Sequence, residues 1–439
     1  MGFVLTLLYI ALALLSPMDL VPSLAEYRIE LLLVLVALLL STPGLLDPRF
    51  FRIPQNYLLA GLFAAVFLSV ALGGHWVGGG WIALQQFLPA AIVFYLVVLN
   101  CQSLSRMRML GSLLAVIAAF YVCEGAAAYL AGDTSSPLVH SFPVADGGVS
   151  LRMQGLGFLR DPNEFAQFLV MVLPFLWIRW REGHHLRNIL IVIAPAALLV
   201  FGIYLTHSRG AIVALVVILM LGLKDRLRPV PTMIAGALGL SILLALNFSG
   251  GRDISLEAGS DRLALWGDGL RLFMQSPLFG VGYLNFAESD FGHTAHNSFV
   301  VCLAELGVVG YVFWVGLLVF TFSGLNSLLA SLKLASVESP ETASDESADP
   351  ETADVERWAR AIRISLAGFL AAAWFLSRAY VLPLYLILGM AVALLAMTSE
   401  EPEPISRKPV WRLAGLTAQL GFAAILLVYL AVRVWWDTF

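Results

Sequence analysis

The sequence predicts an all-α, polytopic integral membrane protein built as a helical bundle. Of its 439 residues, 59% are hydrophobic and only 13% are charged, and the mean hydropathy is +0.85. Apolar stretches long enough to cross a bilayer, about 20 residues each, follow one another along the chain. The net charge is −4, so no basic surface indicates a nucleic-acid partner. This composition excludes a soluble enzyme and a disordered chain.

Thirteen apolar segments are candidate spans, so we expect about 12–13 transmembrane helices in a single membrane domain over residues 1–439. Two of the short segments, 209–223 and 361–376, could be half-helices. The predicted spans are 3–15, 27–43, 57–72, 81–99, 109–131, 163–180, 188–206, 209–223, 230–248, 298–330, 361–376, 381–397 and 411–434.

Basic residues divide unevenly between the two sides of this arrangement. With a cytoplasmic N-terminus, 17 of the 26 Lys and Arg residues, including every Lys, fall on one side. The positive-inside rule makes that side cytoplasmic. The loops 132–162 and 249–297 then face outward, into the periplasm of a Gram-negative cell, and we expect 249–297 to be structured. The acidic stretch 336–356 is poor in large apolar residues and is predicted to be a disordered cytoplasmic linker.

A polar interruption, Thr206 to Ala211, divides an otherwise apolar run. Ser208 can cap the helix that follows, which would put Arg209 beside unpaired backbone N–H groups. A helix N-terminus and a guanidinium together suit a phosphate. The alternative is an arginine that reaches the interface or pairs structurally with a carboxylate.

An amphipathic helix is predicted over Ser260 to Gln275, on the outer side. Arg262 lies near the edge of its apolar face and would need a negative partner in the membrane-embedded body. Arg271 falls on the opposite face and is expected to be a solvated charge. The apolar face is expected to comprise Leu263, Trp266, Leu270, Phe273 and Met274, and the other face Asp261, Asp268, Arg271 and Gln275.

His296 and Asn297 open the next span. A histidine at the outer mouth of a bundle can act as a base, because it titrates near neutral pH. His293 is a competing candidate, and a structural role is the alternative for both. Further on, Gly307 to Gly310 predicts a small-residue face for tight helix packing.

The first interpretation of Asp161 is a helix N-cap, with Pro162 at the first helical position. Arg152 and Arg160, just upstream, are candidate ligands for an anion. Glu124 and Glu305 lie inside spans and are functional candidates without an evident partner. No DxD, HExxH or His/Cys cluster and no P-loop is present, so the sequence predicts no metal site and no cofactor.

Together and in this order, these segments resemble the O-antigen ligase/polymerase superfamily of bacterial membrane glycosyltransferases. The likeness spans roughly residues 150–320. It is carried by GFLRDPNEFA from Gly157, SRGA from Ser208, Asp261-Arg262 with Trp266, SPLFGVG from Ser276, HNS from His296, and GVVG from Gly307.

The resemblance implies transfer of a glycan, linked through diphosphate to undecaprenol, to an acceptor hydroxyl outside the inner membrane. It implies a metal-independent, inverting enzyme with a fold like that of the C-type glycosyltransferases. It assigns Arg209 and Arg262 to the diphosphate and His296 to the base. The further candidates for substrate binding are Arg152, Arg160, Asp161, Asn163, Ser208 and Asn297.

Ligases and polymerases share these motifs, so two readings stay open: transfer to lipid A–core or another final acceptor, and transfer to the next repeat unit of an O-antigen or exopolysaccharide. A bicarbonate or other small-anion transporter is a third, weaker reading. It would need charged residues along a continuous path, whereas the arginines named here gather on the outer side. Ligases of the superfamily often have an even number of spans, whereas thirteen spans would leave the C-terminus outside.

Overall fold

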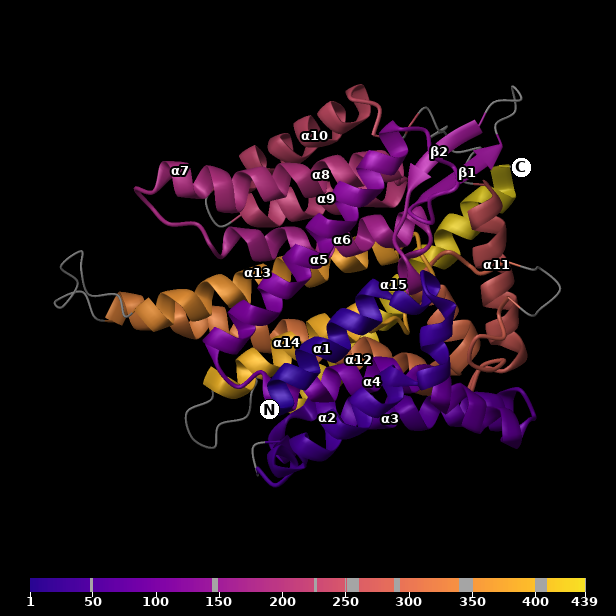
Figure 1. Ribbon diagram of the computed structural model, residues 1–439. Helices are drawn as coiled ribbons and strands as arrows, with labels where there is room; N and C mark the ends of the chain where they lie inside the picture. Colours follow the sequence, from indigo (N-terminus) through magenta and orange to yellow (C-terminus); the bar gives the residue numbers. More distant parts are fainter. Residues whose placement is uncertain are drawn as a thin grey trace. The chain divides into compact units, whose positions relative to one another are not determined.

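The computed structural model describes residues 1–47, 50–143, 149–224, 227–248, 250, 260–287, 293–338, 350–398 and 409–438. Within these ranges the regular structure is helical apart from one two-stranded sheet (Figure 1). The expected all-α fold is confirmed.

Seven of the described helical segments are long and apolar enough to cross a membrane. Each of the thirteen predicted spans overlaps a described helix, but several of these helices are too short to cross a membrane, and Pro350–Ala373 is long enough but not sufficiently apolar. The chain is a multi-pass membrane protein. The seven segments are Gly2–Asp19, Pro54–Gly73, Val77–Asn100, Leu104–Leu130, His185–Thr206, Ser298–Ala335 and Val410–Trp436, and four shorter apolar helices are Ile29–Leu45, Arg209–Leu223, Pro229–Ala245 and Leu382–Thr398.

The chain divides into two compact units, where the sequence suggests a single membrane domain. Each unit is assembled from three separate stretches of chain. Unit 1 comprises Met1–Thr42, Asn100–Asp253 and Ala353–Ala372, and unit 2 comprises Pro43–Leu99, Ile254–Thr352 and Ala373–Phe439.

Unit 1 is a bundle built from α1 (Gly2–Leu15), α2 (Ile29–Leu45), α5 (Leu104–Leu130), α6 (Pro162–Trp177), α7 (His185–Asn188), α8 (Ala194–Thr206), α9 (Arg209–Leu223), α10 (Pro229–Ala245) and α13 (Pro350–Ala373). Its central helix is α6, which is almost entirely buried and packs against α5, α8 and α9. Gln167 on α6 donates a hydrogen bond to the carbonyl of Phe369 on α13 at 2.9 Å. Gln167 and Phe369 are 202 residues apart, so this contact depends on the tertiary fold.

A β-hairpin of β1 (Val139–Pro143) and β2 (Val149–Met153) follows α5. Its strands are antiparallel, and His140 pairs with Arg152. Met153 at the end of β2 is buried, and it lies against Gly125, where a Cβ would be 2.8 Å from its sulfur. The hairpin contacts α5 and α8, which holds Arg152 against this unit.

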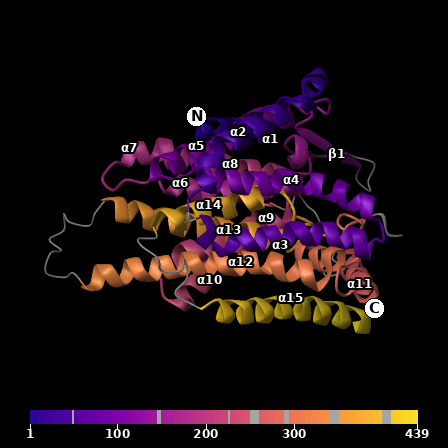
Figure 2. The same cartoon turned by 90° about the horizontal axis from the view of Figure 1, so that it is seen from below.

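Unit 2 consists of α3 (Pro54–Leu68), α4 (Val77–Asn100), α11 (Ser260–Gln275), α12 (Ser298–Glu338), α14 (Leu382–Thr398) and α15 (Val410–Thr438). The long helix α12 is its centre, since α3, α11, α14 and α15 all contact it. Figure 2 shows α12 and α15 lying side by side over much of their length. α14 is buried from Leu382 to Leu395 and forms the core of this unit.

The helix α12 is interrupted at Gly307, whose φ of 62° and ψ of −168° are not helical. The loop that follows α11 enters this break. The Val308 N–H donates to the Pro277 carbonyl at 2.9 Å, and the Gly282 N–H donates to the Glu305 carbonyl at 3.0 Å. The expected helix-packing face at Gly307 is therefore wrong: the glycine admits the backbone of a loop instead of a neighbouring helix.

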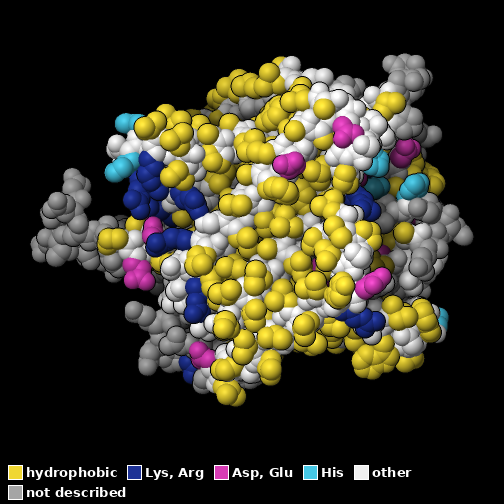
Figure 3. Space-filling model, in the orientation of Figure 1, with side chains coloured by type: hydrophobic (Ala, Val, Ile, Leu, Met, Phe, Trp, Pro, Cys, Tyr) yellow, Lys and Arg dark blue, Asp and Glu magenta, His cyan; other side chains and the backbone are white. Residues whose placement is uncertain are grey.

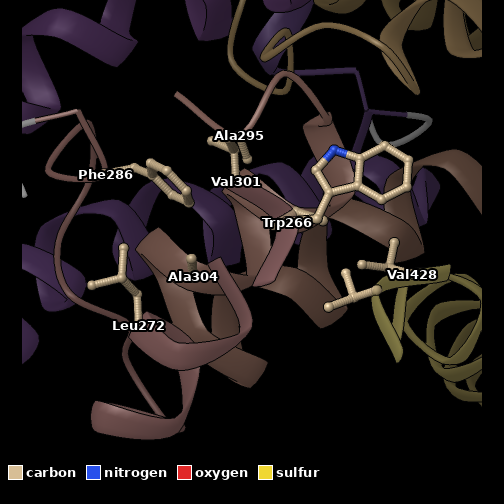
Figure 4. Packing of buried hydrophobic residues seen from close by; sticks show 9 residues of the cluster. Trp266, Leu272, Phe286, Ala295, Val301, Ala304 and Val428 are labelled. Atoms are coloured by element: carbon tan, nitrogen blue, oxygen red, sulfur yellow. The ribbon is translucent and has the colours of Figure 1, made fainter. Parts of the chain in front are cut away.

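The amphipathic helix predicted at Ser260–Gln275 is confirmed as α11, with the same bounds. Its buried face differs from the expected one, because Asp268 is 6% exposed whereas Met274 is 67% exposed. The buried face follows the surfaces of α12 and α15, which contact it, rather than the apolar pattern alone. The hydrophobic cluster drawn in Figure 4 joins the three helices with the loops beside them through Trp266, Leu272, Phe286, Ala295, Val300, Val301, Ala304, Val428 and Val432.

The linker expected at 336–356 is shorter than the sequence suggests. α12 continues to Glu338 and α13 begins at Pro350, so the flanks of the stretch are helical, and residues 339–349 lie outside the described residues. Acidic residues near the start of α13 form ion pairs: Asp354 contacts Arg108 at 2.9 Å, and Glu356 contacts Arg360 at 2.6 Å.

Candidate active site

The junction between α8 and α9 carries the predicted anion site in unit 1. Ser208 is the N-cap of α9, and its Oγ accepts a hydrogen bond from the Ala211 N–H at 3.4 Å. The predicted cap is confirmed. Arg209 is the first residue of the helix and is half-buried, so its guanidinium belongs to the turn whose backbone N–H groups lack helical partners. Both features favour a negatively charged ligand.

His207 immediately precedes this cap and holds a left-handed backbone conformation, with φ of 50°. Its imidazole is buried, its Nε2 lies 3.2 Å from the Tyr129 hydroxyl, and the Tyr204 ring packs edge-on against it. The sequence pattern by itself indicates no role for His207. Its only signal there is a histidine beside the capping serine. The contacts show that it holds the tight turn that presents Arg209.

Arg152, on β2, joins Arg209 in one electrostatic neighbourhood. Burial lowers the pKa of Arg152, the charge of Asp161 opposes that effect, and the charge of Arg209 adds to it. The Arg152 guanidinium lies over the Phe142 ring, 4.1 Å from its centroid. Its Nε is buried and has no hydrogen-bond partner among the described residues. Two cations and a buried unused donor form a site that an anion would stabilise.

Asp161 and Asn163 form the N-terminus of α6. Asp161 Oδ1 accepts from the backbone N–H of Asn163 at 2.8 Å and of Glu164 at 3.3 Å, and also from the Asn163 side chain at 3.1 Å. Pro162 occupies the first helical position. The predicted cap is thus confirmed. It fixes the position of the carboxylate whose charge acts on Arg152.

Arg160 makes a different contact. Its guanidinium lies 3.4 Å from Asp19 Oδ2, and the same oxygen accepts a hydrogen bond from the Gly157 N–H at 2.6 Å. Since the Arg160 side chain is 58% exposed, this ion pair is a surface contact that ties the 3-10 turn at Gly157–Leu159 to the chain after α1. The charges of Asp161 and Arg209 act on Arg152. Arg160 instead forms an ion pair with Asp19.

In unit 2, His296 and Asn297 lie at the start of α12. Asn297 Oδ1 accepts from the backbone N–H of Phe299 at 2.9 Å and of Val300 at 3.1 Å, so the asparagine caps the helix. Asn297 is fully buried, and its Nδ2 has no hydrogen-bond partner among the described residues. His296 has a left-handed backbone, with φ of 48°, and is half-buried, whereas His293 is exposed.

The connection between α13 and α14 closes over this helix start. Ser298 Oγ donates to the Leu376 carbonyl at 2.6 Å and accepts from the Arg378 N–H at 2.8 Å. Ser377 Oγ donates to Thr294 Oγ1 at 2.8 Å. Half-buried Arg378 is not among the residues that the sequence pattern singles out. Its only signal is a lone arginine between two apolar runs. The Arg378 backbone N–H is bonded to Ser298, which lies two positions after His296 in the sequence.

Arg262 of α11 lies over the ring of Phe375, 6.0 Å from its centroid, in this same connection. The sequence predicts a negative partner for Arg262, whereas this contact is with an aromatic face, which also attracts a cation. Arg271, on the same helix, has a 60% exposed side chain and pairs with Asp268. Unit 2 therefore places Arg262, Phe375 and the residues beside His296 around one loop.

Residues 194–315 match the family described as O-antigen ligase. This part of the chain is similar to O-antigen ligases. This match supports the resemblance to the O-antigen ligase/polymerase superfamily, whose members are glycosyltransferase-type membrane enzymes acting on glycan and lipid substrates. A search of curated proteins found no match.

The matched residues include Ser208, Arg209, Arg262, His296 and Asn297. The candidates on β2 and at the start of α6 precede them. Because the charges of Asp161 and Arg209 both act on Arg152, the candidate anion site of unit 1 extends beyond the matched residues.

Glu305 and Glu124, which the sequence analysis left without partners, differ in their surroundings. Glu305 is 2% exposed, and its Oε1 accepts from the Phe286 N–H at 3.3 Å, so it anchors the loop that enters the break in α12. Glu124 is exposed on α5.

Proposed function

We propose that the protein is an O-antigen ligase-like glycosyltransferase that moves a glycan from undecaprenyl diphosphate to an acceptor hydroxyl. The observation that carries the proposal is the position of Arg209 at the capped N-terminus of α9, within residues 194–315 that match the O-antigen ligase family. The charge of Arg209 also acts on Arg152, whose buried Nε has no hydrogen-bond partner among the described residues. A diphosphate is the leaving group of the donor, and its charge grows as the bond to the sugar breaks. Fixed cations and helix N–H groups stabilise such charge without a metal.

Arg209 and Arg262 bind the diphosphate in this proposal, and Arg152 supplies a further donor. Arginine suits the role because its planar fork can bind phosphate oxygens in pairs. Asp161, Asn163 and Ser208 act as positioning residues, since they form the helix starts near Arg152 and Arg209. Arg160 contributes less, because Asp19 already neutralises it.

His296 is the proposed base. Its neutral imidazole accepts the proton of the acceptor hydroxyl, while the oxygen attacks the anomeric carbon and the bond to the diphosphate breaks with inversion. Asn297 keeps the histidine at the helix start by capping α12, and its buried Nδ2 is a donor for a substrate oxygen. His293 is exposed, which makes it the weaker candidate.

The membrane setting follows from the charge distribution. Because 17 of 26 basic residues lie on one side, we propose that this side is the cytoplasmic side of a bacterial inner membrane. The proposed catalytic residues then lie at the periplasmic face. The acceptor, either lipid A–core or a growing glycan, would then be encountered outside the cytoplasm.

The test is a transfer assay with purified protein and undecaprenyl-diphosphate-linked glycan. Wild-type protein should release undecaprenyl diphosphate and extend an added lipid A–core acceptor. His296→Ala should lose transfer while still binding the donor, and His293→Ala is the matched control that should retain it. Turnover by His296→Ala close to wild type would exclude the base role. Extension of the donor glycan without the lipid acceptor would identify a repeat-unit polymerase instead.

A further inference from the structure

A second basic site lies at the other end of unit 1. A cavity of about 250 Å³ opens where α5, α6, α7 and α13 meet. Figure 1 shows α7 and the β1–β2 hairpin at opposite ends of α8, and the roughly 16 helical residues from Ile191 to Thr206 correspond to about 24 Å. The cavity is therefore separate from Arg152 and Arg209. Its polar and aromatic lining includes Arg108, Ser112, Phe175, Arg179, Trp180, Arg181, Arg187, Asp354, Arg357 and Trp358.

Positive charge dominates this cavity, because five arginines line it and Asp354 is the single carboxylate among the lining residues. Asp354 is shared by two of them, Arg108 at 2.9 Å and Arg357 at 3.3 Å. Arg179 donates instead to the Ser112 hydroxyl, and Arg187 donates to the Arg179 carbonyl at 2.7 Å. The lining thus holds more cations than its carboxylate can neutralise, which favours an anionic ligand.

A buried donor in the wall points to the same ligand. Trp358 is 2% exposed, and its indole Nε1 has no hydrogen-bond partner among the described residues. Its ring packs against Phe175, with centroids 5.9 Å apart. A buried N–H group without a partner is costly, so an acceptor atom bound in the cavity would stabilise it.

Apolar surface adjoins the arginines. Trp177 is 51% exposed and stacks on Trp180, with ring centroids 5.0 Å apart, while Leu186 and Leu190 are 72% and 62% exposed. Figure 3 shows Lys and Arg side chains gathered beside hydrophobic surface at the α7 end of the molecule. In a membrane protein, this combination suits a ligand with a charged head and an apolar tail.

We propose that this cavity binds the phosphate group of an anionic phospholipid, with its acyl chains against Trp177, Leu186 and Leu190. Arginine forks match phosphate oxygens, and basic pockets between membrane helices bind anionic head groups. The five arginines belong to the loops that the basic-residue count assigns to the cytoplasm, so the lipid comes from the inner leaflet. The site requires no part of the proposed transfer reaction.

Binding is measured on the full chain in a neutral detergent, by thermal unfolding and by native mass spectrometry. Phosphatidylglycerol should raise the unfolding temperature and remain bound, whereas phosphatidylcholine should do neither. Equal effects of the two lipids would overturn the proposal. Inorganic phosphate tests the source of the anion: stabilisation by phosphate equal to that by phosphatidylglycerol would overturn the assignment to a lipid.

Variants locate the binding. Because each arginine near a membrane contributes about fivefold to anionic lipid binding, Arg181→Gln with Arg187→Gln should weaken phosphatidylglycerol binding about 30-fold. Arg228→Gln is the matched control, an exposed arginine of the same unit outside the cavity. Trp358→Phe keeps an aromatic ring against Phe175 but removes the N–H donor, so it should weaken binding while the protein stays folded. Unchanged binding in the double variant and in Trp358→Phe would exclude the cavity.

Discussion

The backbones of Gly280 and Gly307 approach each other so closely that neither residue could carry a side chain without a clash. A Cβ on Gly280 would be 2.6 Å from the backbone nitrogen of Gly307, and a Cβ on Gly307 would be 2.6 Å from the nitrogen of Gly280. Both residues also have positive φ, at 71° and 62°. This reciprocal approach lets the loop after α11 enter α12, and so it sets where Arg262 and His296 lie within unit 2.

Gly280→Ala and Gly307→Ala should each destabilise the protein by about 2–4 kcal/mol, because a Cβ meets backbone atoms and the positive φ is strained for alanine. The measurement is thermal unfolding in detergent. Gly415→Ala is the control: it lies in α15 with nothing within 4 Å of its Cβ position, so its stability should not fall. Wild-type stability in both Gly280→Ala and Gly307→Ala would contradict the close approach.

Two substitutions of Asn297 separate capping from substrate binding. Asn297→Ala removes the acceptor for the Phe299 and Val300 N–H groups and should cost about 1 kcal/mol. Asn297→Asp keeps that acceptor but loses the buried Nδ2 donor. We expect Asn297→Asp to fold, with a loss of stability from its buried carboxylate that the start of α12 partly offsets, and to bind the lipid-linked donor more weakly. Wild-type donor affinity in folded Asn297→Asp would leave Asn297 with the capping role alone.

Removal of either arginine that is proposed to bind the diphosphate should slow transfer. Arg209→Ala and Arg262→Ala should each lower the rate by about 100-fold or more, as for the loss of one charge-stabilising donor. Arg209→Lys should recover only part of the transfer rate, since an ammonium group cannot bind two phosphate oxygens in the way a guanidinium can. The assay is turnover per folded protein. Arg271→Ala is the control on α11: it should turn over normally but be less stable, because buried Asp268 loses this partner. Slower turnover in Arg271→Ala than in Arg262→Ala would reverse the assignment.

Membrane orientation can be tested by cysteine labelling of intact cells. A cysteine placed within 339–349 should be protected from an impermeant reagent, and one within 251–258 should react. The expectation rests on the excess of Lys and Arg on one side. Cysteine-free protein, with Cys101, Cys123 and Cys302 replaced, provides the background. Labelling of a cysteine within 339–349 from outside would contradict the predicted orientation.

Transfer should persist in EDTA. The sequence lacks a metal-binding motif, and in the described part of the chain no group of three or more His, Cys, Asp or Glu residues could hold an ion. Arginines and helix N–H groups are proposed to stabilise the leaving diphosphate instead. The rate is compared before and after chelation. Loss of activity that added magnesium or manganese restores would refute the metal-independent mechanism.

Several features could be predicted from the sequence because they depend on neighbours along the chain. Ser208 and Asp161 cap helices through hydrogen bonds to residues two or three positions away. α11 has the predicted bounds, since an amphipathic period and a capping residue are local properties. Apolar length likewise predicts where the membrane helices lie. Arg209 could therefore be recognised as the first residue of a helix before any fold was known.

Tertiary structure alone decided the contacts between distant residues. Asp268 is buried although it belongs to the polar side of the α11 pattern, because α12 and α15 both pack against that helix. Gly307 admits a loop that starts about 30 residues earlier in the sequence, and Ser298 binds a connection 78 residues later. Arg152 reaches the neighbourhood of Arg209 through the hairpin. Periodicity describes one helix at a time, whereas these contacts depend on which surfaces fill the space between helices.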